Sequence, residues 1–309
     1  MTIWEARTEA ANQLKNASNK NIQFSTPLLD SDCILAHILK RNRTFLIAHA
    51  QDLLDADDEH SFFALIDMRK TGIPVAYLTN SKEFFGYDFF VNQNVLIPKP
   101  DTEILVQKTI DILVNLIEKK NTDFRIADIC TGSACIPLSL LRYLLDYTKF
   151  NTTDFAMKID CTDISEQALA VAKINAEKLL GVEQNLIDFY QGDLLAPLAQ
   201  FENYDCILSN PPYIPSVMVD DLLLDGRSEP RIALDGDIGV AESCDGMVII
   251  SRLIPQAYQK LSRGGYFIIE TGEYNAHLAA HLMEDVGFYG VCTYKDLSEQ
   301  PRVTIGRKK

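Results

Sequence analysis

From about residue 101 onward, short apolar segments of strand length alternate with longer amphipathic segments of helix length. Repeated strand–helix–strand units predict a mainly parallel sheet with helices on both faces. The predicted strands are residues 125–129, 158–163, 186–190, 204–209 and 266–270. The predicted helices are residues 101–120, 133–145, 165–180, 247–261 (stopped by Gly264-Gly265) and 275–286, with a long loop before the fourth. Two final strands, near 289–294 and 302–306, have no helix between them and predict an antiparallel hairpin at one edge.

The first 73 residues have a different pattern, which predicts helices only. Thr2 followed by Glu5 is a capping box at a helix start. A later helix is predicted to begin at Asp57 and to end at Gly72. The segment 82–91 is rich in aromatic residues and broken by one glycine, which is typical of a β-hairpin. The chain is thus predicted to divide into a small helical-bundle domain (1–73), a β-hairpin linker (74–100) and an α/β domain (101–309).

Charge and composition narrow the class of protein. The chain has 43 acidic and 29 basic residues, a net charge of −14. An acidic surface repels phosphate backbones, so we do not expect nucleic acid as the partner. A protein partner is expected instead. No apolar run reaches the roughly 20 residues that span a bilayer. The N-terminus does not have the pattern of a signal peptide. These features predict a cytoplasmic enzyme with no membrane partner.

Cysteine and histidine usage predicts neither a disulfide framework nor a metal site. The seven cysteines are odd in number and form no C-x-x-C pair. His277 and His281 stand four residues apart on one predicted helix face, but no third ligand accompanies them. A solvated helix face is therefore the expected role of this pair.

Three strand ends carry residues suited to a nucleotide-like cofactor, because doubly wound sheets bind ligands beyond the carboxyl ends of their strands. The first strand ends at Asp128 and leads into a glycine-containing turn. The second ends at Asp163, which can accept hydrogen bonds from ribose hydroxyls or can cap the next helix. After the third, Asp193 can accept from an adenine amine, with Leu194 covering the ring face, or can be a turn residue.

The fourth strand ends in the tetrapeptide Asn210-Pro211-Pro212-Tyr213. Two prolines fix two φ angles and remove two backbone donors, which gives a stiff loop with free carbonyls. The side-chain oxygen of Asn210 and the carbonyl of Pro211 can together accept both hydrogens of an amide or amine NH2 group. Tyr213 offers an aromatic surface for a planar group. The loop therefore indicates a planar nitrogen as the acceptor of a transferred group.

With these residues in place, the chain resembles the peptide chain release factor glutamine-N5 methyltransferases, the HemK/PrmC family, over nearly its whole length. The resemblance rests on residues 74–78, 83–86, 96–103, 210–213, 229–234 and 302–307. It implies a class I (Rossmann-like) methyltransferase sheet and a helical N-terminal domain that recognises the substrate. The implied substrate is the glutamine of the Gly-Gly-Gln loop in class I peptide chain release factors.

The resemblance also implies the cofactor and the site. S-adenosylmethionine would be the methyl donor, and the catalytic block would be Asn210, Pro211, Pro212 and Tyr213. The contacts to S-adenosylmethionine would come from Asp128, Cys130, Thr131, Gly132, Ser133, Ala134, Asp163, Asp193, Leu194 and Asn210. No metal and no general base are implied.

The sequence departs from the family pattern at three places. Cys130 and Ala134 replace two of the three glycines in the first turn, Lys99 replaces an arginine, and the loop at 235–245 is longer than usual. Side chains at 130 and 134 fit without strain if Cys130 has a negative φ and if Ala134 already lies within the helix. Otherwise we expect weaker cofactor binding.

Three other functions remain open at this point. The acceptor glutamine could belong to a ribosomal protein. The same tetrapeptide could hold the exocyclic amine of adenine for N6 methylation, although the acidic charge argues against it. Loss of two glycines could also mark a non-catalytic adaptor.

Overall fold

The computed structural model describes residues 1–309 apart from 18–21, 23, 120–122, 152–155, 227 and 241–244. The described chain forms two compact units. One comprises Met1–Ser81 with Asp220–Glu229, and the other Lys82–Val219 with Pro230–Lys309. Residues 241–244 of the predicted long loop lie outside the described ranges.

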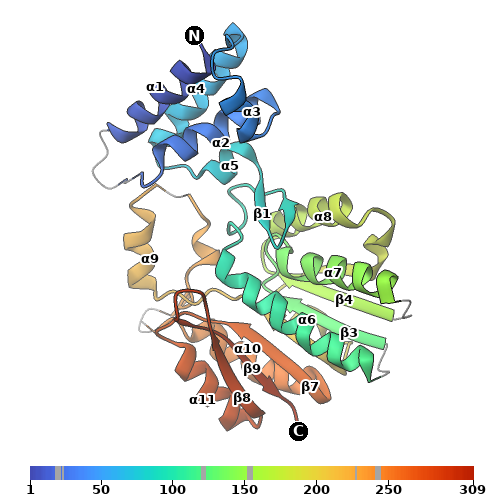
Figure 1. Ribbon diagram of the computed structural model, residues 1–309. Coiled ribbons are helices and arrows are strands. Elements are labelled where there is room, and N and C mark those ends of the chain that lie inside the picture. Colours follow the sequence, from blue (N-terminus) through green and yellow to red (C-terminus); the bar gives the residue numbers. More distant parts are fainter. Residues whose placement is uncertain (18–21, 23, 120–122, 152–155, 227, 241–244) are drawn as a thin grey trace. The chain divides into compact units, whose positions relative to one another are not determined.

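The first unit is helical, as predicted (Figure 1). Its helices are α1 (Ile3–Lys15), α2 (Pro27–Leu39), α3 (Arg43–Ala48), α4 (Ala56–Lys70) and α5 (Val75–Thr79). The capping box of Thr2 and Glu5 is confirmed. The prediction for α4 was wrong by one residue at its start, because the Asp55 side chain accepts from the Asp57 N–H and makes Asp55 the N-cap. The core is apolar and includes Leu14, Ile34, Leu35, Phe62 and Ile66.

The second unit contains the predicted sheet. Its strands are β3 (Asp123–Ile129), β4 (Ala156–Asp163), β5 (Ile187–Gln191), β6 (Tyr204–Ser209), β7 (Leu261–Glu270), β8 (Tyr289–Lys295) and β9 (Pro301–Arg307). They lie in the order β5-β4-β3-β6-β7-β9-β8. The first five are mutually parallel, while β9 pairs antiparallel with both β7 and β8. The predicted doubly wound sheet and its antiparallel edge are confirmed.

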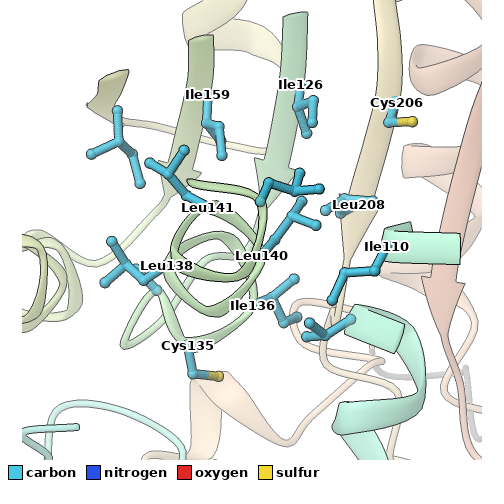
Figure 2. Close-up of a cluster of buried hydrophobic side chains, with 14 of the residues drawn as sticks. Ile110, Ile126, Cys135, Ile136, Leu138, Leu140, Leu141, Ile159, Cys206 and Leu208 are labelled. Carbon is cyan, nitrogen blue, oxygen red and sulfur yellow. The ribbon is translucent and has the colours of Figure 1, made fainter. Parts of the chain in front are cut away.

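Helices cover both faces of this sheet (Figure 1). One face carries α6 (Glu103–Glu118), α7 (Cys135–Asn151) and α8 (Glu166–Leu180), and the other carries α10 (Val248–Lys260) and α11 (Ala276–Val286). Figure 2 shows how α7 packs, with Leu140 and Leu141 lying near Ile126 of β3 and Ile159 of β4. These side chains are almost fully buried, so the sheet and α7 form a rigid platform for the residues at the strand ends.

Two sequence predictions about the later chain were wrong. Residues 210–246 are not loop alone, since α9 (Ser216–Leu223) lies within them and buries Val219. Gly264 and Gly265 do not stop a helix: α10 ends at Lys260 and β7 runs through both glycines. Gly265 stands where an added Cβ would lie 2.9 Å from the Tyr204 carbonyl oxygen, so close approach of β6 explains this glycine.

The predicted hairpin is confirmed as β1 (Lys82–Phe84) and β2 (Tyr87–Phe89), paired antiparallel. Phe84 and Phe89 are buried in the core beneath α6 and α7. Four short 3-10 helices complete the described elements: η1 (Pro100–Thr102), η2 (Gly181–Leu186), η3 (Ala196–Leu198) and η4 (Arg231–Ala233). Within the described ranges, no helix is both long and apolar enough to cross a bilayer.

Candidate active site

A cavity of about 280 Å³ lies at the carboxyl ends of the central parallel strands. Nine of the residues predicted from the sequence line it: Cys130, Thr131, Gly132, Ser133, Asp163, Asp193, Leu194, Asn210 and Pro212. Four do not line it: Asp128, Ala134, Pro211 and Tyr213. The structure therefore brings the turn after β3 and the loop after β6 to one space, as expected at a topological switch point.

The turn after β3 is built from alternating left-handed residues. Cys130, Gly132 and Ala134 have φ values of +62°, +54° and +60°. Neither condition for strain-free side chains is met, because Cys130 has a positive φ and Ala134 precedes α7, which begins at Cys135. An L-residue in this conformation brings its Cβ close to the following carbonyl oxygen. All three positions that the sequence resemblance assigns to glycine thus keep the backbone that favours glycine.

Asp163 holds this turn from the neighbouring strand. Its Oδ2 accepts from the Gly132 N–H at 2.9 Å and its Oδ1 accepts from the Ser165 N–H at 2.9 Å. The helix cap itself is Ser165, whose hydroxyl accepts from the Ala168 N–H. Burial raises the pKa of Asp163, and its backbone hydrogen bonds partly lower it again. Each carboxylate oxygen keeps a lone pair that can accept from a ligand in the cavity.

Asp128 lies below the turn and away from the cavity. It is fully buried, and neither carboxylate oxygen makes a hydrogen bond of ordinary geometry to the described residues. Burial raises the pKa of Asp128 to about 7, although the nearby Thr131 hydroxyl lowers it in part. Asp128 does not line the cavity, so it can affect a bound molecule only through the turn above it.

At the far end of the cavity, Asp193 forms an ion pair with Arg252 of α10. Leu194 has a left-handed backbone with a φ of +49°, and its carbonyl accepts from the Thr162 hydroxyl at 2.9 Å. Arg252 also lines the cavity and was not predicted from the sequence. An arginine on a helix face carries no local signal that it meets a strand end far away in the sequence.

The loop after β6 is fixed by contacts on both sides. The Asn210 Nδ2 donates to the Thr102 hydroxyl at 3.1 Å. The Tyr213 hydroxyl donates to Glu270 Oε1 at 3.1 Å, and the Tyr213 carbonyl accepts from Asn275 Nδ2 at 2.9 Å. Because the ring of Tyr213 is tied in this way and does not line the cavity, its role as a stacking surface stays a prediction.

Sequence reasoning missed two further buried residues, one beneath this loop and one beside the turn after β3. Glu270 is 1 % exposed at the end of β7, and burial raises its pKa to about 7. Asn175 of α8 is fully buried and donates to the carbonyls of Ser133 and Phe90, both at 3.0 Å, so it fastens the turn to the hairpin. A carboxylate closing the fifth strand could have indicated Glu270, whereas nothing local distinguishes Asn175.

Comparisons with known proteins bear on what this site does. A family model described as the PrmC N-terminal domain matches residues 5–79, and one described as the methyltransferase small domain matches residues 105–223. Proteins called release factor glutamine methyltransferase match almost end to end. The one from Clostridium acetobutylicum is 33% identical, covering 99% of this chain and 98% of the relative. The one from Moorella thermoacetica is 35% identical, covering 94% and 92%.

Among solved structures, a ribosomal protein L11 methylase from Lactobacillus delbrueckii subsp. bulgaricus is 17% identical with a TM-score of 0.45, covering 68% of this chain and 81% of its own. That likeness carries no argument about function. The sequence relatives identify the family, because they cover both units and exceed 30% identity. The chain belongs to the family of release factor glutamine methyltransferases.

Proposed function

We propose that this protein transfers a methyl group from S-adenosylmethionine to the side-chain amide nitrogen of the glutamine in the Gly-Gly-Gln loop of a class I peptide chain release factor. The observation that carries the proposal is the orientation of Asn210 at the cavity. Its Nδ2 is engaged by Thr102, which leaves the side-chain oxygen to accept from an acceptor NH2 group. The names of the relatives supply the substrate class.

The residues around the cavity fit S-adenosylmethionine. Asp163 offers carboxylate lone pairs to ribose hydroxyls, and Asp193, which also lines the cavity, can accept a hydrogen bond from an adenine amine. Ile164 and Leu194 also line the cavity, and their apolar side chains suit a ring face. The carboxylates also suit the positive charge of a sulfonium. When bound, this cofactor supplies an electrophilic methyl group.

Asn210 and Pro211 would make the main contribution of the protein to the reaction, which is to orient the acceptor nitrogen. An amide nitrogen is a poor nucleophile, because its lone pair is delocalised into the carbonyl. The Asn210 side-chain oxygen and the Pro211 carbonyl would accept one hydrogen each, turn the face of the nitrogen toward the methyl group, and stabilise the positive charge that grows on it. Since Pro211 and Pro212 restrict the loop, this orientation is prepared before the acceptor arrives.

A purified release factor tests the proposal directly. The protein is incubated with isotopically labelled S-adenosylmethionine and the release factor, and the labelled residue is located by mass spectrometry. The label is expected on the glutamine of the Gly-Gly-Gln loop, and it should disappear in a release factor with alanine at that position. A label on another residue, or none at all, contradicts the proposal.

The same assay separates the other functions. A ribosomal protein fraction and a single-stranded oligonucleotide rich in adenine are offered in parallel with the release factor. Label in the oligonucleotide would support adenine-N6 methylation, which the net charge of −14 disfavours. Calorimetry with S-adenosylmethionine tests the adaptor hypothesis, because an adaptor that has lost its cofactor shows no binding heat.

A further inference from the structure

Glu270 is a buried carboxylate directly beneath the loop that carries Asn210. The Tyr213 hydroxyl donates to its Oε1 at 3.1 Å. Its Oε2 is buried and has no partner of ordinary hydrogen-bond geometry in the described part of the chain. Burial of a carboxylate with incomplete pairing destabilises the fold. Its presence at the carboxyl end of β7 therefore indicates a function.

Thr102 holds Asn210, the first residue of the tetrapeptide, while Glu270 holds Tyr213, the last. The Thr102 side chain is 2 % exposed, and its hydroxyl accepts from Asn210 Nδ2 at 3.1 Å. The same hydroxyl lies near Glu270 and lowers the pKa of that carboxyl, but the two side chains form no hydrogen bond of ordinary geometry. Because the Thr102 hydroxyl accepts from the Asn210 NH2 group, the Asn210 side-chain oxygen is left for an acceptor in the cavity.

We infer that Thr102 and Glu270 are positioning residues for methyl transfer. Thr102 turns the NH2 group of Asn210 away from the acceptor and its oxygen toward it. Glu270 holds the other end of the same tetrapeptide through Tyr213. This inference rests on the proposed function, because it concerns the loop that would hold the acceptor amide.

The arrangement explains why three separated segments meet. Thr102 belongs to the segment at 96–103, Tyr213 to the tetrapeptide, and Arg302 to the closing strand. Arg302 pairs with Asp296 at 2.8 Å, and its charge also lowers the pKa of Glu270. Each segment supplies one group to the surroundings of the Glu270 carboxylate.

The protonation state of Glu270 affects its hydrogen bond to Tyr213. The titratable and charged groups that face it are Asp101, Cys135, Tyr213 and Arg302. Ionised Glu270 accepts from the Tyr213 hydroxyl, whereas the protonated acid carries a proton of its own that competes with this bond. Methyl transfer is therefore expected to rise as the pH rises through about 7, the pKa to which burial raises this group.

Thr102→Val and Thr102→Ser form a matched pair. Valine replaces the hydroxyl by a methyl group, whereas serine loses the methyl group and keeps the hydroxyl. With a release factor as acceptor, Thr102→Val is expected to lower kcat roughly 10- to 100-fold through a misdirected Asn210 side chain. Thr102→Ser is expected to keep most of the activity. Both should bind S-adenosylmethionine as the wild type does in calorimetry, with similar melting temperatures. Equal activity in the two variants overturns the inference.

Glu270→Gln provides the readout that a purely structural role would not change. At saturating cofactor and acceptor, the wild-type kcat should increase across the pH range on both sides of 7. In Glu270→Gln it should be low and lack that step. The inference is wrong if the step persists in the variant or if kcat stays at the wild-type level. A wild-type protein that does not methylate the release factor would contradict the proposed function instead, so the two failures are distinct.

Discussion

Cys130 and Ala134 have the same left-handed backbone on either side of Gly132, with φ values of +62° and +60°. Glycine adopts this conformation without a steric cost, whereas another L-residue is strained by roughly 1–2 kcal/mol. The two side chains differ in surroundings: Cys130 lines the cavity, and Ala134 is buried outside it. Their replacement by glycine should therefore have different effects.

We expect Cys130→Gly to tighten S-adenosylmethionine binding by roughly 1 kcal/mol, about fivefold, because it removes a side chain from the cavity wall and lets the turn adjust to the cofactor. Ala134→Gly should leave the affinity unchanged, and the double variant should bind like Cys130→Gly. Calorimetric titration of the three variants measures this. If Cys130→Gly binds no more tightly than the wild type, the turn already fits its ligand.

Thermal stability without cofactor gives a separate test of the strain. The sequence alone suggests a slight loss in the glycine variants, because glycine gives the unfolded chain more freedom, worth about 0.4–1 kcal/mol. The positive φ at Cys130 reverses that expectation, since the relieved strain exceeds this cost. Gly132→Ala is the matched control: its added Cβ meets no atom within 4 Å, so it should destabilise the fold by strain alone, roughly 1 kcal/mol.

Asn210→Ala should abolish methyl transfer while cofactor binding stays nearly intact. The variant removes the oxygen that would stabilise charge on the acceptor nitrogen, and loss of one such group typically lowers kcat by ~100-fold or more. Single-turnover kinetics with the release factor, beside calorimetry with the cofactor, give both quantities. Retention of more than about a tenth of the wild-type rate would exclude this role.

Asp128→Asn should stabilise the fold at alkaline pH. Burial raises the folded-state pKa of Asp128 from 3.8 to about 7, so the folded state disfavours the ionised form. The corresponding stability is present below the unfolded-state pKa and is lost as the pH rises toward 7. The amide cannot ionise, so its advantage should approach an upper bound of about 4 kcal/mol above pH 7 and shrink in acid. Urea unfolding at several pH values checks this, and a pH-independent difference would refute it.

Removal of the helical unit should separate substrate recognition from catalysis. We expect a chain beginning at Lys82, where the second compact unit starts, to fold and to bind S-adenosylmethionine. It should methylate the intact release factor poorly, because contacts outside the active site are lost. A short peptide containing Gly-Gly-Gln is the control, since both proteins should turn it over at similar rates. Equal turnover of the intact release factor would contradict the predicted recognition role of the helices.

Local patterns in the sequence were sufficient for most of the architecture. Apolar periodicity depends on neighbouring residues, so it correctly predicted the strands, the helical N-terminal unit and the antiparallel edge. The rule that ligands bind beyond strand ends located Asp163, Asp193 and Asn210 at one cavity. Periodicity failed for α9, which is short, and at Gly264-Gly265, where a strand continues through residues that usually end helices.

The chemistry of the site depended on contacts that no local pattern contains. The sequence by itself determined which strand ends carry polar groups and that a stiff Asn-Pro-Pro-Tyr loop follows the fourth of them. Only the tertiary structure decided that Thr102 and Glu270 lie beneath that loop and that Cys130 has a left-handed backbone. The reason is physical: hydrogen bonds between residues 108 positions apart, and a φ angle imposed by the packing of a turn, arise only when the sheet brings its strand ends together.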